Sequence, residues 1–288
     1  MSTSYPKTIK ILLAGATVFL AAGVQSAVIV PVNQFSTSAA YTNNFNRLSQ
    51  TPYLNWSSAV GPNGNSGILT GFVPPSAVTS SNLYDTTPSG AGENVFSNIS
   101  WDSDVKFGSL SPTLGLAYTA GTSATNALFM VLNLTAVSGD LQARYFTGYN
   151  PSTAATGTAA SGGTGTQNAT VSGTGIVSDQ WMHLRLDVTT SASRVTMALN
   201  VYNSTTLFDA TTLKASFSYA FSVANSASYL SGGQIGYRTT ANTTGGVTAL
   251  DNFAVYDAGT APVPEPSSVA LLVAGIGACG LLLRRRSK

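Results

Sequence analysis

The chain has 288 residues, of which only 8% are charged, and its formal net charge is +2. Ordinary domains carry about 25% charged residues, so hydroxyl and amide side chains must form most of this surface. Seven basic residues stand against ten acidic ones between residues 28 and 262, with no basic stripe; this argues against nucleic acid and favours an extracellular protein that meets neutral polymers such as polysaccharides.

Residues 1–27 have the three parts of a secretory signal peptide. Lys7 and Lys10 form its positive segment, residues 11–24 its apolar segment, and small side chains close it. We predict cleavage after Ser26 or Ala27. The alternative is an uncleaved membrane helix, but the apolar segment is short for crossing ~30 Å of hydrocarbon. The rest of the chain is therefore expected to pass through the secretion machinery and meet signal peptidase.

Apolar and polar residues alternate through much of residues 28–262, which is the period of a strand with one buried face. In the strand predicted at 181–188, Met182 and Leu184 point one way and His183 and Arg185 the other. A turn at 189–193 joins it to a strand at 194–202 as a hairpin. Further strands are predicted at 97–107, 114–119, 127–137, 141–147, 215–223, 234–237 and 250–256.

Many strands separated by Gly, Ser, Asn and Thr turns predict an all-β fold. We expect a single β-sandwich, a jelly roll, over residues 28–262. Residues 150–175 are almost wholly Ser, Thr, Gly and Ala. They lack the apolar side chains that offset ordering entropy, so a long flexible loop is predicted there.

Asp102 and Asp104 lie two residues apart on a predicted strand, so both side chains share a face with Cα atoms about 6.5 Å apart. A retaining glycosidase needs carboxyl groups about 5 to 5.5 Å apart, which makes a catalytic pair one interpretation. A solvated strand face is the other, and it is the one we expect. We therefore assign no catalytic residue.

Calcium is a further alternative, because carboxylate and amide oxygens are its ligands. No compact Asp-x-Asp-x-Asp-Gly loop is present, so no metal is assigned and no other cofactor is expected. The residues named as ligand or calcium candidates are Asp102, Asp104, Asp251 and Asn252.

His183 is the only histidine, which excludes a His-rich metal site and leaves one base for a Ser-His-Asp triad. We expect it half-exposed on the outer face of its strand. Aromatic rings beside polar loops could stack on a sugar ring, with packing at strand ends as the alternative. The residues of this kind are Tyr53, Trp56, Tyr84 and Tyr149.

The C-terminal tail, residues 263–288, has three ordered parts: the tripeptide Pro264, Glu265 and Pro266, the apolar residues 269–283, and a basic end. We expect the apolar part to form a transmembrane helix, which at 1.5 Å per residue is short even for a thin bilayer. By the positive-inside bias the basic end stays in the cytoplasm, so the body faces outward. The arginines of that end are Arg284, Arg285 and Arg286. The single cysteine, Cys279, lies in the apolar part, so the body can form no disulfide.

This order of parts resembles the PEP-CTERM sorting signal of Gram-negative bacteria. The resemblance implies that a membrane-embedded exosortase recognises Pro264, Glu265 and Pro266 and cleaves near them. It also implies that the protein is held in the inner membrane by its tail before it reaches the cell surface or the extracellular matrix. Members of that family are associated with exopolysaccharide and biofilm production.

The C-terminal half of the body is similar to the concanavalin A-like or LamG-like jelly roll of exported binding modules. Residues 181–186, 195–202, 234–238 and 251–256 carry this resemblance. It implies architecture more than activity, because lectins, glycosidases and structural modules share the fold. The laminarinase-type enzymes of this fold place glutamates on their catalytic strand, whereas residues 28–262 contain only Glu93 and no Glu-x-Asp-x-x-Glu arrangement.

Three functions follow as hypotheses. The first is a non-enzymatic, exported surface or matrix protein that binds polysaccharide. The second is a glycan-active hydrolase or lyase on the same fold, which requires paired acids on a concave face. The third is a purely structural envelope protein without a ligand. The expected partners are the exosortase, the membrane through the tail, and exopolysaccharide, but not nucleic acid.

Overall fold

A computed structural model gives the structure of the chain. It describes residues 28–33, 35–39, 45–47, 54–62, 64, 66–71, 78–84, 96–108, 113–123, 125–135, 139–153, 157–222, 227–241 and 248–258. The predicted signal peptide, the sorting tail and Tyr53 lie outside these residues. Within them, no helix has both the length and the apolar character that a membrane crossing requires.

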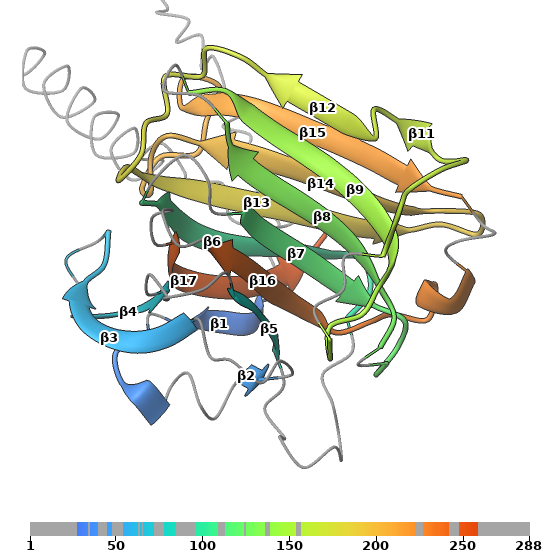
Figure 1. Ribbon diagram of the computed structural model, residues 1–288, viewed down its shortest axis with the longest axis horizontal. Helices are drawn as coiled ribbons and strands as arrows, with labels where there is room; N and C mark the ends of the chain where they lie inside the picture. Colours follow the sequence, from blue (N-terminus) through green and yellow to red (C-terminus); the bar gives the residue numbers. More distant parts are fainter. Residues whose placement is uncertain are drawn as a thin grey trace, which may run out of the picture.

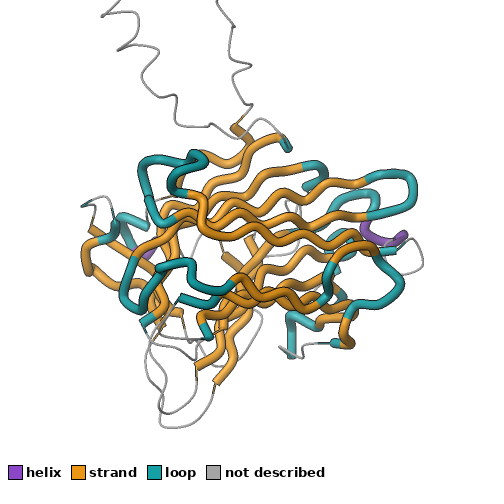
Figure 2. Tube along the Cα trace, turned by 90° about the horizontal axis from the view of Figure 1, so that it is seen from above, coloured by secondary structure: helices purple, strands orange, loops and turns teal. Residues whose placement is uncertain are grey.

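The described strands form two antiparallel sheets that pack face to face (Figure 1), and Figure 2 shows them from above as two layers with loops at their ends. Sheet A has nine strands in the order β11-β15-β14-β13-β6-β17-β4-β3, with β1 beside β17. Sheet B has eight in the order β10-β9-β8-β7-β16-β5-β2, with β12 beside β9. The all-β sandwich predicted from the sequence is confirmed.

The strands of sheet A are β1 (Val28–Asn33), β3 (Leu54–Val60), β4 (Ser66–Gly71), β6 (Ile99–Phe107), β11 (Thr164–Gly165), β13 (Trp181–Thr190), β14 (Val195–Tyr202), β15 (Leu213–Phe221) and β17 (Thr248–Asp257). Those of sheet B are β2 (Phe45–Arg47), β5 (Val78–Tyr84), β7 (Thr113–Thr119), β8 (Ala127–Leu134), β9 (Leu141–Tyr149), β10 (Thr158–Ala159), β12 (Asn168–Val171) and β16 (Ile235–Ala241). A short 3₁₀ helix, η1 (Ala227–Tyr229), precedes β16.

The predicted hairpin of β13 and β14 forms, with Leu184 opposite Val201 and Leu186 opposite Leu199. The apolar face of β13 points into the core, as the alternation predicts. One prediction in this region of the chain is wrong. Residues 157–175 are not a structureless loop, because they contain β10 and β12, which pair with β9, and β11, which pairs with β15. Backbone hydrogen bonds pair β10 and β11 without apolar side chains, and β12 adds Ala169 and Val171, which pack against the core.

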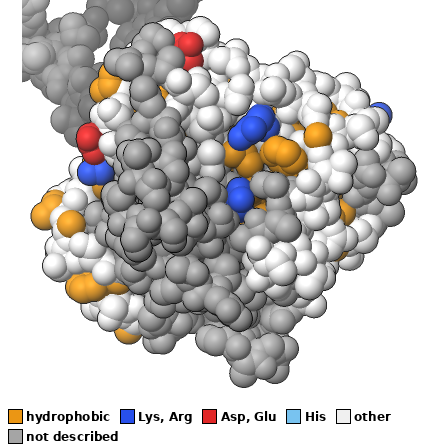
Figure 3. Space-filling model, viewed as in Figure 1, with side chains coloured by type: hydrophobic (Ala, Val, Ile, Leu, Met, Phe, Trp, Pro, Cys, Tyr) orange, Lys and Arg blue, Asp and Glu red, His pale blue; other side chains and the backbone are white. Residues whose placement is uncertain are grey.

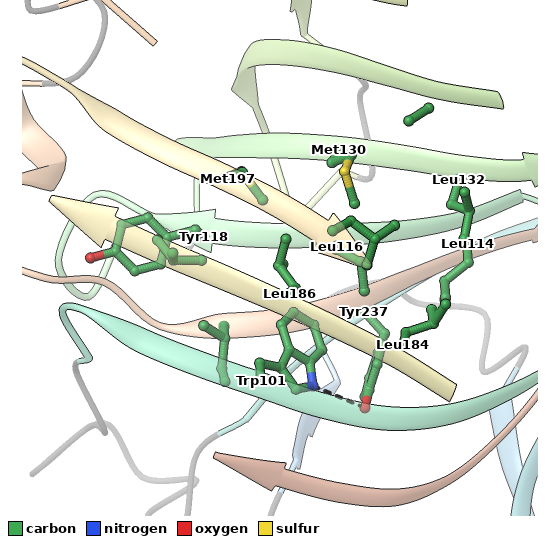
Figure 4. Close-up of a cluster of buried hydrophobic side chains, with 14 of the residues drawn as sticks. Trp101, Leu114, Leu116, Tyr118, Met130, Leu132, Leu184, Leu186, Met197 and Tyr237 are labelled. Carbon is green, nitrogen blue, oxygen red and sulfur yellow. Dashed lines mark hydrogen bonds between the residues drawn. The ribbon is translucent and has the colours of Figure 1, made fainter. Parts of the chain in front are cut away.

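The core fills the space between the sheets with side chains from both (Figure 4). Trp101 and Tyr237 meet edge to face, with ring centroids 4.8 Å apart. The Trp101 Nε1 donates to Tyr237 Oη at 3.3 Å, and that hydroxyl donates to Ser103 Oγ at 3.0 Å. Ser103 Oγ in turn donates to the main-chain oxygen of Asp251 at 3.0 Å. This chain of bonds satisfies buried polar groups and fixes β17 against β6, where the charged residues described next lie.

Candidate functional site

The outer face of sheet A carries a buried cluster of polar side chains from β6, β13 and β17. Register decides which of them meet: His183 lies opposite Asp104, and Arg185 lies opposite Asp102. On the other side of β6, Asp251 lies opposite Asp104. We call six residues the ionic cluster: Asp102, Asp104, His183, Arg185, Asp251 and Asn252.

Arg185 holds Asp102 through two hydrogen bonds. Its Nε donates to Oδ1 at 3.0 Å and its Nη2 to Oδ2 at 2.9 Å, the bidentate geometry that makes guanidinium–carboxylate pairs strong. His183 lies between the two aspartates. Its Nδ1 is 2.8 Å from Asp104 Oδ1, and its Nε2 is 3.4 Å from Asp102 Oδ2. The second contact is close enough for an ion pair but is not aligned as a hydrogen bond.

A β-bulge in β17 brings Asn252 into the ionic cluster. The pairing with β6 shifts between Asp251 and Ala254, and Asn252 adopts the left-handed conformation with φ of 53°, which Asn accepts more readily than most residues. Its side-chain amide donates to Asp104 Oδ2 at 2.6 Å. Its main-chain N–H donates to Asp251 Oδ1 at 2.8 Å. Both oxygens of Asp104 are therefore bound by protein groups.

The pairing sets the protonation of these groups. Burial by itself raises the pKa of Asp102, but the hydrogen bonds and charges of His183 and Arg185 outweigh it and lower that pKa. Burial by itself lowers the pKa of His183, but Asp102 and Asp104 raise it above the ordinary value. Burial raises the pKa of Asp251 to about 7, partly opposed by the Asn252 N–H and helped by the charge of Asp104. Two carboxylates thus face two cations, beside a third acid that titrates near neutral pH.

Phe208 covers the ionic cluster. Its ring stacks on His183 with centroids 3.8 Å apart and planes at 13°, and Arg185 Cζ lies 5.9 Å from the same ring. His183 is 5% exposed and Asp104 is 1% exposed. The expected half-exposed histidine and solvated strand face are therefore wrong. Cross-strand pairing neutralises the charges and Phe208 closes over them, and neither contact is visible in the alternation of β13.

The four residues named as calcium candidates do come together in the ionic cluster. Their arrangement favours ion pairing over metal binding, because Asp102 and Asp104 already accept hydrogen bonds at every carboxylate oxygen. Within the described part of the chain, no group of three or more His, Cys, Asp and Glu side chains is arranged to hold a metal ion. The same hydrogen bonds occupy the carboxylate oxygens that a catalytic pair of Asp102 and Asp104 would need.

The outer face of sheet B is built differently. The pairings place Arg238, Gly115, Val131, Arg144 and Asn168 in one row across β16, β7, β8, β9 and β12. All five alternate with residues that point into the core. Strands lie about 4.8 Å apart, so the Cα atoms of the two arginines, three strand spacings apart, are about 14 Å from each other.

An aromatic stack supports one of these arginines. The rings of Phe129 and Tyr149 lie parallel, with centroids 4.1 Å apart, and Arg238 Cζ is 5.6 Å from the first ring and 5.9 Å from the second. Gly115 makes room for this stack, because a Cβ at that position would lie 2.1 Å from the Phe129 ring. Phe146, which is half-buried, lies 6.1 Å from Phe129.

Polar atoms on this face lack partners. Arg144 Nε, Arg238 Nε and Asn133 Oδ1 are buried and make no hydrogen bond to a described residue, and no ion pair joins either arginine to one. Figure 3 shows basic side chains beside apolar ones in the middle of this side of the molecule. We call this surface the arginine face. Its residues are Phe129, Asn133, Gln142, Arg144, Phe146, Tyr149, Asn168, Thr170 and Arg238.

The aromatic residues proposed for sugar stacking have different positions. Trp56 packs against the core, and its Nε1 donates to the main-chain oxygen of Phe35 at 2.6 Å. Tyr149 is 0% exposed, so its ring is a support for Arg238 and has no open face for a sugar. Tyr84 ends β5, and its side chain, like all of Tyr53, lies outside the described residues.

Sequence reasoning missed the three arginines of these two surfaces, the cover Phe208, and every residue of the arginine face except Tyr149. The arginines are Arg144, Arg185 and Arg238. Strand alternation was a sufficient signal that the three arginines point outward. It could not show that Arg144 and Arg238 share a row, because strand order and register join residues that are far apart in the sequence. Phe208 lies in the connection between β14 and β15, where no periodicity exists to place it.

Comparisons with known proteins give two results for the whole chain. No curated protein sequence matches it. Several solved structures are similar to the body. A protein with a galectin-like fold from Bacillus subtilis is 11% identical, with a TM-score of 0.45 over 81% of this chain and 97% of that one. The β-glucanase of Bacillus licheniformis is 10% identical, with a TM-score of 0.44 over 79% of this chain and 97% of that one, and the carbohydrate-binding module CBM66 of Bacillus subtilis is 13% identical, with a TM-score of 0.38 over 74% and 96%.

The tail gives a more specific result. Residues 262–286 match the model of the PEP-CTERM protein-sorting motif. The match covers the tripeptide Pro264, Glu265 and Pro266 together with Arg284, Arg285 and Arg286, so the resemblance stated from the sequence is confirmed for these residues. The C-terminus of this chain therefore carries a PEP-CTERM sorting motif, which implies export, processing by an exosortase and sorting to the cell surface.

Proposed function

We propose that this chain is an exported, non-enzymatic protein whose β-sandwich binds polysaccharide at the cell surface or in the extracellular matrix. Before processing, the tail would anchor it in the inner membrane. The sorting motif supports the location. The arginine face supports the binding role.

The observation that carries the binding role is the set of unpaired hydrogen-bonding groups on the arginine face. Arg144 Nε, Arg238 Nε and Asn133 Oδ1 are buried without partners, and such groups cost free energy until a ligand satisfies them. Gln142, Asn168 and Thr170 lie on the same face. Amide, hydroxyl and guanidinium groups beside the partly exposed ring of Phe146 match a sugar, which presents hydroxyls at its edge and C–H groups on its faces.

Polysaccharide retention and bond cleavage, measured together, test this proposal. The full chain, purified in a mild detergent, is passed over immobilised neutral and acidic polysaccharides, and the release of reducing ends is followed in parallel. Retention without release is the expected result. Release of reducing ends would replace the proposal by an enzyme, and absence of any retention would leave a purely structural envelope protein.

A glycan-active enzyme is the second candidate, because Asp251 adjoins Asp104 and has its pKa raised to about 7, a value suited to general acid–base work. Burial argues against it. Asp251 is 0% exposed, and Phe208 covers the neighbouring His183, so substrate reaches the carboxyl groups only after this cover moves. If the chain releases reducing ends, Asp251→Asn should abolish the release, whereas Asp257→Asn, at the exposed end of the same strand, should not.

A further inference from the structure

We propose that the arginine face binds an acidic polysaccharide, with Arg144 and Arg238 each receiving a sugar carboxylate. This inference rests on the proposed function and gives the ligand its chemical class. The composition of the chain predicted neutral polymers as partners. An acidic polymer is proposed instead, because these two positive charges lie together on one face, whereas composition reports only the net charge of the whole body.

Neither Arg144 nor Arg238 has a counter-charge among the described residues. Each guanidinium is half-buried, and neither makes an ion pair within the described part of the chain. Each also has a buried Nε without a hydrogen-bond partner. A partly desolvated cation without a partner is costly, and an incoming anion removes that cost.

The second step is that the geometry is fixed before binding. Arg238 is held over the Phe129 and Tyr149 rings, and both rings are 0% exposed. A guanidinium on an aromatic platform loses little further freedom when it binds an anion. The planar fork of Arg matches a carboxylate through two parallel hydrogen bonds.

The third step concerns the polymer. The Cα atoms of the two arginines lie about 14 Å apart, at three strand spacings, so the two guanidinium groups suit a chain that carries carboxylates at intervals. Between the arginines the row holds Val131 and Gly115, and the Phe129 ring packs over Gly115. Gln142 and Thr170 border the row, with Gln142 Nε2 donating to Thr170 Oγ1 at 3.4 Å. Amides and hydroxyls of this kind bind sugar hydroxyls, which a simple polyanion lacks.

The fourth step excludes nucleic acid as the preferred occupant. Duplex DNA carries one charge per about 1.7 Å and is bound by proteins that neutralise many phosphates at once. The arginine face offers two cations, and residues 28–262 as a whole have more acidic than basic residues. Sparse negative charge on a hydroxyl-rich polymer fits this surface better.

Matched ligands and matched variants test the inference. Binding of the full chain in detergent is measured with polygalacturonate, with the same polymer after full methyl esterification, and with dextran and dextran sulfate. The variants are Arg144→Gln and Arg238→Gln, and Arg194→Gln is the control, because Arg194 lies in the turn before β14 of sheet A and donates to the Ala220 oxygen. Thermal unfolding of each variant confirms that it is folded.

We expect polygalacturonate to bind and its methyl ester to bind at least tenfold more weakly. Each arginine variant should raise Kd by about tenfold or more, the value for a charge-assisted hydrogen bond, while Arg194→Gln leaves Kd unchanged. Dextran sulfate tests whether sulfate replaces carboxylate, and tighter binding of it than of polygalacturonate overturns the carboxylate assignment.

Other outcomes separate this inference from the proposed function. If neutral and acidic polymers bind equally, or if both variants keep wild-type affinity, polysaccharide binding survives and the role of the arginines is wrong. If single-stranded DNA displaces polygalacturonate at equal charge concentration, the face is a general anion site and the inference is wrong. If no polysaccharide binds at all, the proposed function itself is wrong.

Discussion

On the outer face of sheet A, Arg185 is held by both oxygens of Asp102, whereas on the outer face of sheet B neither Arg144 nor Arg238 pairs with a described carboxylate. Both faces belong to one sandwich and both place their arginines by the same strand alternation. The two faces differ in the residues that lie opposite the arginines on the neighbouring strands. In sheet A the neighbours are aspartates, and in sheet B they are Gly115 and Val131.

This difference separates a structural role for charge from a binding role. Charges that neutralise one another beneath Phe208 are shielded from solvent, and they stabilise the fold only as long as all partners remain. Charges that have no ion-pair partner among the described residues, as on the arginine face, contribute little to folding and are available to a ligand. The comparison therefore predicts opposite responses to substitution on the two faces.

The largest effect is expected from Asp102→Ala. It leaves the guanidinium of Arg185 buried without its carboxylate and removes the Asp102 contact of His183, so the free energy of unfolding should fall by about 3 kcal/mol or more. Urea unfolding followed by tryptophan fluorescence measures this. Replacing both partners, Asp102→Leu with Arg185→Met, should recover much of the loss. A loss below about 1 kcal/mol for Asp102→Ala would show that the pair is not desolvated.

Asp251→Asn should change how stability depends on pH. The folded pKa of Asp251 is about 7 and its ordinary value is 3.8, so the folded state prefers the protonated form. The stability that protonated Asp251 contributes is fully present below about pH 4. It is lost as the pH rises to about 7, by up to about 1.4 kcal/mol of unfolding free energy per pH unit. The amide does not titrate. The free energy of unfolding of the variant should therefore rise relative to that of the wild type over this range, and the difference should stay constant above pH 8.

Unfolding midpoints measured from pH 4 to pH 9 check this prediction. Asp102 and Asp104 raise the pKa of His183, and both remain in the variant, so the loss of stability that His183 causes above about pH 6.5 should largely cancel in the difference. Parallel pH curves for the two proteins would mean that Asp251 is ionised in the fold with an ordinary pKa.

Gly115→Ala should destabilise the arginine face through sterics alone. The new Cβ would meet the Phe129 ring at 2.1 Å, so the stack of Phe129 and Tyr149 must shift, at a cost of roughly 1–3 kcal/mol. Calorimetry measures the fall in Tm. In a Phe129→Leu background the same substitution should cost less than half as much, and equal costs in the two backgrounds would show that the ring does not lie over Gly115.

The smallest effect is expected from Arg238→Gln. The substitution removes a partly desolvated cation that has no ion-pair partner among the described residues. Burial and the charge of Arg144 lower the pKa of Arg238, partly opposed by Tyr149, so the fold disfavours the charged form of this side chain. Stability should change by about 0.5 kcal/mol or less, measured by urea unfolding beside Arg185→Gln. A loss comparable to that of Arg185→Gln would assign Arg238 a structural role.

Much of the fold could be read from period-two alternation, because the two faces of a strand differ in polarity wherever one packs on a core. The strands predicted at 181–188 and 194–202 lie within one or two residues of β13 and β14. The segment 157–175 could not be predicted in this way. β10 and β11 are two-residue edge strands with exposed side chains. β12 alternates over only four residues, with Ala169 and Val171 packed against the core, which is too short a pattern to mark a strand.

The candidate sites divide in the same way. Local sequence placed Asp102 and Asp104 on one face of β6 and marked the pair Asp251 and Asn252, and the structure joins these to His183. It did not predict that the cluster would be buried. His183 was expected to be half-exposed, and its burial depends on Phe208, which is more than twenty residues away in the chain.

The sequence by itself determined the sorting motif at residues 262–286, the all-β class and the direction in which each strand residue points, because these depend on contiguous residues. Only the tertiary structure decided which charged side chains became neighbours. Strand order and register place Asp102 beside Arg185 and leave Arg144 and Arg238 in a row without a carboxylate. Electrostatic interaction depends on distance in space, and only the pairing of the strands sets that distance.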